Sequence, residues 1–565
     1  MNPLYGRSMI SRALLLVALA APAGAQGTPQ PGITVFQPSR STTTFAVDLA
    51  GDVVQSWPGS FRPGSAVYLA PNGDLVRTQN LNGGFAGGGG GGGIERVSWD
   101  GQVLWSFQYT GATFHSHHDI ALMPNGNVLM IAWDAVGGAA AVAAGRNPAG
   151  LGGAFLAEEI IEVEPDGLGG ASVVWRWRAF DHLVQDFDAT KPGFGVPADH
   201  PGRLDINFPA GGGGQNGDWL HCNGIDYNAE LDQIVISSRA LSEIWVIDHG
   251  TTTQEAAGST GGTRGRGGDL LYRWGNPAAY GRGTAADQRL YGQHDCQWID
   301  EGLPGAGHLL VFNNGTNRPA GAFSSADEVV PPINAAGTYD LAPLQSYGPA
   351  AAVWTGTHPN ANSFFSTTTS GCQRLPNGNT MMVEGDSGLF IEIDPAGALV
   401  WSWQSDLAGA GSERTFKGRR LPGGVTGLAY CDPAVANSTG VPATLHAVGS
   451  LVADENALVL WAQGMPSGTF GFFLNGSSSG SFPMAGGSAG TLCLSGDLGR
   501  YANPAEIFSG GAAGVGSLEL DLTRTPTPSG RVPAMAGETW FFQCWYRDPA
   551  VGTSNFTNGV QIDLL

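Results

Sequence analysis

Residues 371–403 read GCQRLPNGNTMMVEGDSGLFIEIDPAGALVWSW, and their pattern decides the fold. Short apolar and β-branched runs alternate with turns built from Pro, Asn, Gly and Asp. Such runs between turn residues predict β-strands rather than helices. The segment therefore predicts four short antiparallel strands, the last of which carries tryptophan.

The same pattern occurs in four earlier segments of the chain. They begin with SAVYLAPNGD at residue 65, HHDIALMPNGN at 117, LHCNGIDYNAELD at 220 and HDCQWIDEGLPG at 294. Four strands with a tryptophan-bearing outer strand are typical of a β-propeller blade. The sequence therefore predicts an all-β protein with at least five blades.

A sixth blade is predicted from the two ends of this region. Before the first copy, TTFAVDLAG (43–51) and VVQSWPG (53–59) have the pattern of an outer strand pair. After the fifth copy, RTFKGRRLPGGVTGLAY (414–430) can supply an inner pair. Closing the ring in this way removes exposed edge strands. We therefore expect a six-bladed propeller whose last blade is closed by both chain ends.

Three segments divide the chain. Residues 1–25 have a positive start, a short apolar stretch and a small-residue cleavage site, which predicts a secretory signal peptide and a periplasmic or secreted protein. Residues 26–435 contain the propeller repeats. Residues 440–565 hold alternating strands without the repeat, which predicts a small C-terminal β-sandwich.

Composition excludes two classes of partner and leaves the cysteine pairing to be tested. The formal net charge is −21, from 27 basic and 48 acidic residues, which argues against nucleic-acid binding and against docking on anionic membranes. An exported protein can form disulfides, and we expect Cys493 to pair with Cys544.

Three histidines occupy matching places in the repeat. Counted back from the turn after each first strand, His118, His221 and His294 have the same offset, and Ser65 and Ser370 hold that offset in the other two copies. The first strand of each blade lines the central channel of a propeller. We therefore expect three imidazoles at one level around a common axis.

Three convergent imidazoles suit two chemistries. They can bind zinc, or they can bind and transfer an oxyanion, with one ring as nucleophile and the others as donors. Arg239, in IVISSRALSEI, lies at the end of the strand that follows His221. A guanidinium repels a metal ion but matches sulfate or phosphate oxygens, so it favours the second chemistry.

Residues 40–430 resemble the bacterial arylsulfate sulfotransferases. The resemblance rests on DWLHCNGIDY with IVISSRALSEIWVID, on YGQHDCQW with LLVFNNG, and on HHDI with PNGNVL. It implies an exported six-bladed propeller that moves a sulfuryl group from an aryl sulfate donor to a phenolic acceptor through a sulfohistidine. No cofactor or nucleotide sulfate donor is implied.

The resemblance also implies roles for the residues in these motifs. His294 would be the nucleophile, His221 and Arg239 would hold the sulfuryl oxygens, and His118 would exchange a proton with the phenolic oxygen. We add Ser370 and Asn223 as substrate-binding residues.

The residues beside the histidines are expected to be structural. Strand alternation points Asp295 and His117 away from the channel. Cys222 and Cys296 are expected to be buried thiols, and the glycine run at 87–93 a flexible hairpin loop.

Two alternatives remain open at this stage. One is a metal-dependent propeller hydrolase or lyase that uses the same three histidines. The other is a non-catalytic binding propeller. We expect no counterpart of the family's N-terminal sandwich domain, which the resemblance links to dimerisation, so the oligomeric state is also open.

Overall fold

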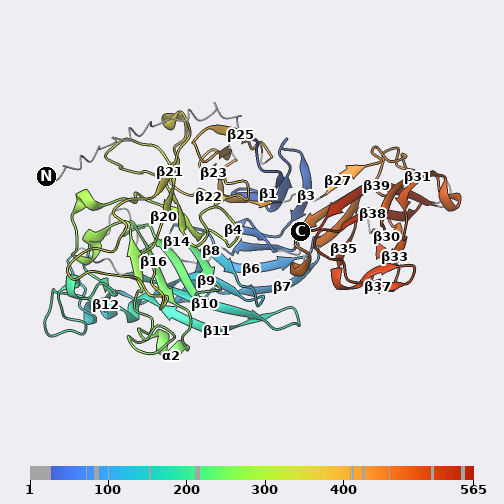
Figure 1. Ribbon diagram of the computed structural model, residues 1–565. Helices are drawn as coiled ribbons and strands as arrows, with labels where there is room; N and C mark the ends of the chain where they lie inside the picture. Colours follow the sequence, from blue (N-terminus) through green and yellow to red (C-terminus); the bar gives the residue numbers. More distant parts are fainter. Residues whose placement is uncertain are drawn as a thin grey trace, which may run out of the picture.

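The computed structural model describes residues 27–70, 73–81, 88–99, 101–149, 151, 154–209, 217–407, 409, 413–422, 427–456, 458–510, 514–548 and 554–565. The protein is all-β, with 45% strand and 7% helix (Figure 1). The expected signal peptide lies outside the described residues. None of the helices in the described ranges has the length and apolarity needed to cross a membrane.

Residues 371–403 form four antiparallel strands paired in chain order, as predicted. They are β22 (Gly371–Arg374), β23 (Thr380–Glu384), β24 (Leu389–Ile393) and β25 (Leu399–Gln404). Turns with glycine in the left-handed conformation, such as Gly378 at φ 87°, connect them. Glycine adopts this conformation without the steric cost that a side chain would bring.

The earlier repeats form the same unit. One sheet contains β14 (Cys222–Asn228), β15 (Gln233–Ser238), β16 (Glu243–Asp248) and β17 (Tyr272–Trp274). The next contains β18 (His294–Trp298), β19 (Leu309–Asn313), β20 (Ser325–Val329) and β21 (Trp354–Gly356).

The first two repeats join into an eight-stranded sheet. Its halves are β4 (Pro63–Leu69), β5 (Leu75–Asn80), β6 (Gly92–Val97) and β7 (Val103–Gln108), and β8 (Phe114–Leu122), β9 (Val128–Ala135), β10 (Leu156–Pro165) and β11 (Ala171–Arg178). A parallel pairing of Ser65 with His118 links the halves.

Both ends of the repeat region meet in one sheet, but not as the two strand pairs that the sequence suggested. The sheet contains β26 (Thr415–Pro422), β1 (Gly32–Pro38), β2 (Thr43–Val47) and β3 (Val53–Pro58), in that order. The expectation of two strands from each end is therefore wrong. The stretch before residue 43 adds an unforeseen strand, and β27 (Leu428–Tyr430) pairs instead with a strand of the C-terminal part.

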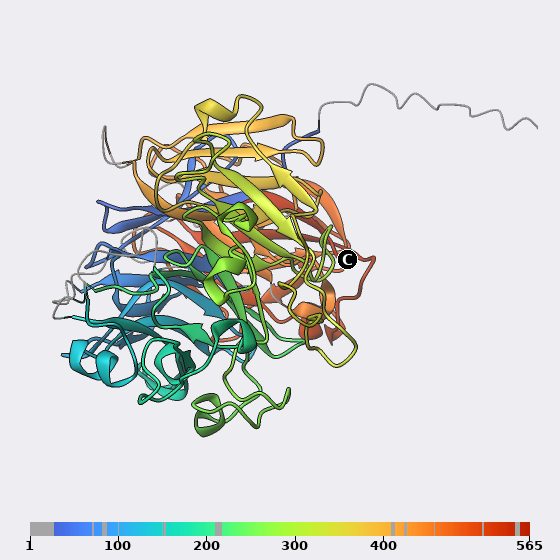
Figure 2. The same ribbon diagram turned by 90° about the vertical axis from the view of Figure 1, so that its left-hand side faces the viewer.

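The innermost strands form a closed cycle of contacts. Each innermost strand contacts the next, and the last contacts the first, in the order β4, β8, β14, β18, β22, β26 and back to β4. Figures 1 and 2 show the consequence, since β22–β25 lie next to β1–β3 although the sequence separates them widely.

Tryptophans of the outermost strands tie each sheet to the next. Their indole N–H groups donate to backbone carbonyls: Trp57 to Trp99 at 3.1 Å, Trp177 to Gly268 at 2.8 Å, Trp274 to Pro349 at 2.8 Å, Trp354 to Pro395 at 3.1 Å and Trp401 to Leu49 at 2.8 Å. An indole can bury its ring and still satisfy its N–H in this way. This explains the tryptophan at the end of the second to fifth repeats, and Trp57 of β3.

Irregular segments between the strands contribute short elements outside the four-stranded sheets. These are α1 (Gly138–Ala143), α2 (Thr253–Ala256), β12 (Leu183–Val184) and β13 (Leu204–Asp205). The apolar core lies between adjacent sheets, and its largest cluster joins Trp177 of β11 to Ile234 of β15 and Trp245 of β16.

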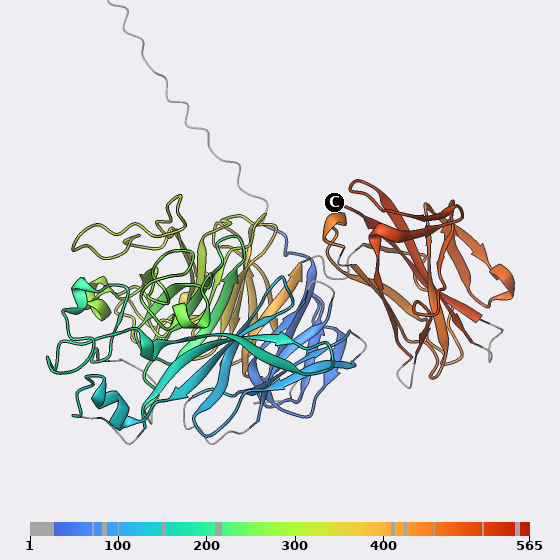
Figure 3. The same cartoon turned by 90° about the horizontal axis from the view of Figure 1, so that it is seen from below.

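The strands after residue 427 gather beside the repeat region (Figure 3). They are β27, β28 (Thr444–Gly449), β29 (Leu458–Gln463), β30 (Phe470–Gly476), β31 (Ser478–Pro483), β32 (Thr491–Ser495), β33 (Gly499–Tyr501), β34 (Phe508–Ser509), β35 (Gly516–Leu520), β36 (Thr525–Thr527), β37 (Gly530–Val532), β38 (Thr539–Arg547) and β39 (Ser554–Asp563). Trp461 of β29 packs edge-on against Trp99, with ring centroids 5.4 Å apart, and so connects this part to the repeats.

The predicted disulfide between Cys493 and Cys544 is wrong in one of its two cysteines. Cys493 pairs with Cys431, and Cys544 is a buried free thiol. Strand alternation along β38 turns Cys544 into the apolar core with Phe542 and Tyr546. Cys431 instead follows β27 and lies within reach of β32.

Candidate functional site

The positions that the sequence argument aligned share an unusual backbone conformation, in or just before the inner strands. Ser65, His118, His221 and Ser370 have φ values of 113°, 56°, 47° and 87°. These left-handed conformations are uncommon for residues with a side chain, and such strain concentrates at functional sites. Strand pairing also shifts register next to these positions in β4 and β8. The matched offsets in the sequence thus correspond to a shared backbone feature.

The fourth repeat departs from this rule by one residue. There the left-handed residue is Asp295, at φ 50°, and the register shift falls between His294 and Cys296. A bulge of this kind re-aims the neighbouring side chain. His294 therefore lies one residue before the left-handed position rather than at it.

The structure brings the three predicted histidines and Arg239 together in one cavity of about 440 Å³. The rings of His118 and His221 lie 4.9 Å apart. Phe416 of β26 lies near two of the histidines, with its ring centroid 5.8 Å from that of His118 and 6.0 Å from that of His294. The site thus combines imidazoles from three sheets with an aromatic surface from a fourth.

His294 presents an unprotonated nitrogen to this cavity. Asn314 uses its amide N–H₂ for the carbonyls of Ser366 and Thr369, so its Oδ1 accepts the proton of His294 Nδ1 at 2.8 Å. The Thr369 N–H points at His294 Nε2 from 3.2 Å. Burial, helped by the nearby Arg239 charge, lowers the pKa of His294 to about 3. The ring is therefore neutral, and its unprotonated Nε2 accepts the Thr369 N–H.

A carboxylate orients His221. His221 Nδ1 donates to Asp218 Oδ2 at 2.7 Å, and the Asp218 side chain is fully buried. This leaves Nε2 for the cavity. A carboxylate in this position also stabilises positive charge on the ring, which suits a donor to an anion.

His118 is held by its neighbour in the chain. Its Nδ1 lies 2.7 Å from Nδ1 of His117, which leaves Nε2 as the ring nitrogen for the cavity. His117 stacks on Trp133 with ring centroids 4.0 Å apart and does not line the cavity. The prediction that His117 faces away is therefore confirmed, although it contacts the site directly.

The cavity is positive. Among the described residues that line it, Arg239 and Arg414 are cations and none is Asp or Glu. Arg239 directly follows β15, and its backbone N–H donates to the carbonyl of His221 at 3.2 Å, which fixes the two residues relative to each other. Arg414 lies at the mouth, half exposed, with Asp386 3.5 Å away. Such a surface is suited to an anion.

The two predicted substrate-binding residues, Ser370 and Asn223, are not among the described residues that line the cavity. Ser370 is fully buried, and its hydroxyl accepts from the Gly385 N–H at 2.9 Å. Asn223 is also fully buried and donates to the carbonyl of Gln293 at 2.9 Å, which braces the residue before His294. Thr368 and Thr369 line the cavity instead.

The glycine run at 87–93, predicted only as a flexible hairpin loop, contributes to the cavity. Gly87 lies outside the described residues, but Gly88, Gly89 and Gly90 line the cavity. A Cβ atom at Gly88 would lie 3.1 Å from Cε1 of His221, and one at Gly89 would lie 2.3 Å from Cε1 of His118. The glycines thus let the backbone pass directly over two of the histidines. Their clustering in the sequence was the available signal.

A buried charge cluster lies next to His118 and His294 in the sequence. Asp295 pairs with Arg419 and with Lys417, whose Nζ also lies 2.6 Å from Asp119. Burial opposes the charge of Asp295, but Arg419 and Lys417 hold the pKa of its carboxyl below its usual value. Asp295 also accepts the N–H of Cys372 in the next sheet at 2.9 Å. Asp295 therefore links two sheets, in keeping with the structural role expected for it.

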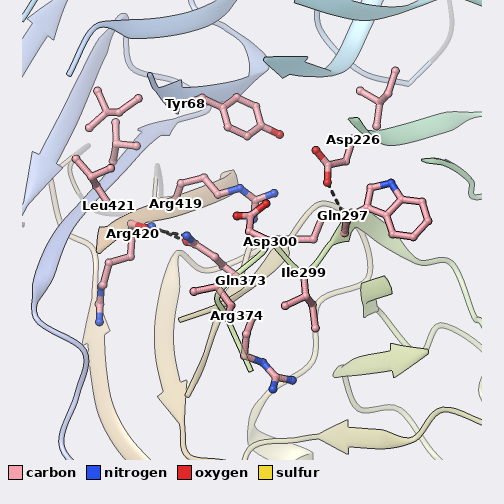
Figure 4. A pocket seen from close by; sticks show the side chains of 15 residues that line it. Tyr68, Asp226, Gln297, Ile299, Asp300, Gln373, Arg374, Arg419, Arg420 and Leu421 are labelled. Atoms are coloured by element: carbon pink, nitrogen blue, oxygen red, sulfur yellow. Dashed lines mark hydrogen bonds between the residues drawn. The ribbon is translucent and has the colours of Figure 1, made fainter. Parts of the chain in front are cut away.

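A second cavity of about 270 Å³ lies beyond this cluster (Figure 4). Tyr68, Asp226, Asp300 and Arg419 line it, and none of the three histidines does. The expectation that Cys222 and Cys296 are buried thiols is confirmed. Burial raises the pKa of each thiol well above its usual value, which lowers the reactivity of a cysteine.

Metal binding finds no geometric support here. In the described ranges, no three or more His, Cys, Asp and Glu side chains are arranged to hold a metal ion. Only the Nδ1 atoms of the three histidines are engaged by Asn314, Asp218 and His117.

Comparison with known proteins identifies the family. The family model described as Arylsulfotransferase (ASST) matches residues 23–398. No curated protein sequence matches the chain. Similar solved structures include a protein of unknown function from Bacteroides caccae, 12% identical, covering 69% of this chain and 98% of its own, with TM-score 0.37. A protein from Lactobacillus plantarum is 10% identical, with coverages of 77% and 92% and TM-score 0.34.

The matched range spans two thirds of the chain and includes every histidine and arginine of the cavity described above except Arg414. The chain therefore belongs to the arylsulfotransferase family and is an aryl sulfate sulfotransferase.

Proposed function

We propose that the enzyme transfers a sulfuryl group from an aryl sulfate to a phenol through a sulfohistidine at His294. The observation that carries this proposal is the protonation of His294. Its Nδ1 proton is directed at Asn314. Its unprotonated Nε2, which accepts the Thr369 N–H, belongs to a cavity whose described lining residues include Arg239 and Arg414 and no carboxylate. A neutral imidazole is a competent nucleophile, and an anionic donor is drawn to such a surface.

In the first half-reaction, His294 Nε2 attacks the sulfur of the donor. The N–S bond forms as the bond between sulfur and the aryl oxygen breaks, and the electron pair leaves on the phenolate oxygen. Arg239 and Nε2 of His221 lie where they can donate to the sulfuryl oxygens. His118 Nε2 gives its proton to the leaving oxygen.

In the second half-reaction, the acceptor phenol discharges the sulfohistidine. His118 Nε2 takes the phenolic proton while the phenolic oxygen attacks sulfur, and the N–S bond breaks with its electron pair returning to His294. General acid–base help of this kind is worth about 10²–10⁴-fold in rate. The aryl rings of donor and acceptor have Phe416 as an apolar surface beside both His118 and His294.

The architecture that we propose is a six-bladed propeller over residues 26–435, followed by a β-sandwich over 440–565. The closed cycle of inner-strand contacts supports the propeller. The separate cluster of buried residues that contains Leu460, Phe542 and Ile562 supports the sandwich. We also propose export, directed by residues 1–25.

The test is intact-protein mass spectrometry after brief exposure to para-nitrophenyl sulfate without acceptor. Wild type and a His200→Ala control, at an exposed histidine, should each gain one SO₃ group, and His294→Ala should gain none. Added phenol should then remove the group. Phenol release that depends on metal and survives in His294→Ala would favour the metal-dependent alternative, and binding without any release would favour the non-catalytic one.

A further inference from the structure

Two more buried ionisable side chains continue the line from the cavity through His118. His117 Nε2 lies 2.9 Å from Glu158 Oε2, on β10, while His117 Nδ1 lies 2.7 Å from His118 Nδ1. The side chains of His117 and Glu158 are both 0% exposed. The stacked ring of Trp133 fixes the plane of His117. The three groups thus form one hydrogen-bonded chain that leads from the cavity into the sheet.

The hydrogen-bonded groups His118, His117 and Glu158 can hold their protons in two ways without any heavy atom moving. When Glu158 is ionised, it accepts from His117 Nε2–H, and His117 Nδ1 accepts from His118 Nδ1–H. His118 Nε2 then presents a lone pair to the cavity. When Glu158 is protonated, each bond reverses, and His118 Nε2–H becomes a donor. The other oxygen, Oε1, accepts the Cys222 N–H at 2.8 Å in both states.

We propose that His117 and Glu158 are positioning residues that supply and store the proton that His118 exchanges with the phenolic oxygen. The proposal rests on the role proposed above for His118. In the first half-reaction, the Nε2 proton of His118 moves to the phenolate, the Nδ1 proton of His117 moves to His118 Nδ1, and the Glu158 proton moves to His117 Nε2. The second half-reaction runs these transfers in reverse. Each imidazole loses one proton and gains one, so neither becomes charged.

The electrostatic surroundings favour the neutral forms of Glu158, His117 and His118. Burial, and then the charge of Asp218, raises the pKa of the Glu158 carboxyl well above its usual value. Burial, and then His221, lowers the pKa of both His117 and His118 well below the usual value. The other charged or titratable groups that face the chain are Glu159, Asp134, His115, His294 and Arg239. These directions favour a protonated Glu158 beside two neutral rings, the arrangement in which His118 Nε2 carries the proton for the leaving group.

Glu158→Gln tests this arrangement because the amide preserves the contacts but cannot exchange the proton. Its oxygen still accepts from Cys222, and its N–H₂ donates to His117 Nε2, which locks His118 with a proton on Nε2. The matched control is Glu159→Gln, one residue along β10. Its carboxylate points to the other face and accepts from the Tyr109 hydroxyl at 2.8 Å.

The readout separates the two half-reactions. With para-nitrophenyl sulfate, whose phenolate leaves without needing a proton, Glu158→Gln should form the adduct within about threefold of the wild-type rate. Discharge by phenol, a weak acid that needs a base, should slow by about 100-fold. Glu159→Gln should leave both rates near wild type. His117→Asn should show the same separation as Glu158→Gln.

Equal slowing of both half-reactions in Glu158→Gln and His117→Asn would overturn the proposal, because a structural role affects both steps alike. Discharge at the wild-type rate would also overturn it. If wild type itself forms no adduct, the sulfohistidine proposal fails instead, so the two failures are distinguishable.

Discussion

Replacing Gly89 by alanine should disable the site without unfolding the protein. A Cβ atom there would lie 2.3 Å from Cε1 of His118, whereas ordinary contact begins at 3.4 Å, so the ring or the loop must move by about 1 Å. A misplacement of about 1 Å in catalytic geometry costs about 10²-fold in rate. We therefore expect kcat/KM for aryl sulfate and phenol to fall by about 100-fold.

The matched control for this substitution is Gly101→Ala. Gly101 also has a left-handed conformation, at φ 92°, and a Cβ atom there would have open space around it. Both variants pay a similar backbone penalty of about 1–3 kcal/mol, so their thermal unfolding should be similar. If Gly89→Ala kept kcat/KM within threefold of Gly101→Ala, the close approach of the glycine loop to His118 would not matter for activity, and the reasoning would be refuted.

Four further outcomes follow from the contacts described above. Asp218→Asn should lower kcat/KM by about 10-fold or more, since a neutral amide no longer stabilises charge on His221; an unchanged value in steady-state assays would contradict this. Arg239→Lys should also lower kcat/KM at least about 10-fold, because an ammonium lacks the fork that matches sulfuryl oxygens. The free energy of unfolding should fall as pH falls below about 6.5, because the unfolded chain takes up a proton that folded His294, with its pKa lowered to about 3, does not; denaturant titrations should show a flatter acid limb for His294→Gln. Trp401→Phe should cost about 1 kcal/mol of stability through the lost hydrogen bond to the neighbouring sheet, with kcat unchanged.

The repeat could be read from the sequence because its signals are local. Strand runs, Pro-Asn-Gly turns and terminal tryptophans recur within each copy, and the offsets of His118, His221 and His294 follow from them. The closing sheet was only partly predictable, because β27 has the same local pattern whichever sheet it joins. Its partner, β39, lies more than a hundred residues away.

The partners of the histidines were harder to predict, because they come from different parts of the chain. Glu158 reaches His117 from another strand, and Asn314 reaches His294 from the end of β19. Neither has a fixed spacing from the histidine it serves. Asp218 lies three residues before His221 in the quoted motif and could have been noticed. The bulge at Asp295, which re-aims His294, has no signature in residue type.

The most direct test of the account is to locate the sulfuryl group and time its removal. Wild-type enzyme would be mixed with para-nitrophenyl sulfate, quenched at alkaline pH, digested and mapped by mass spectrometry, with and without a pulse of phenol. We expect one SO₃ group on the peptide that contains His294, lost after phenol at a rate no slower than kcat. An SO₃ group on another residue, or one on His294 that phenol removes more slowly than kcat, would contradict it.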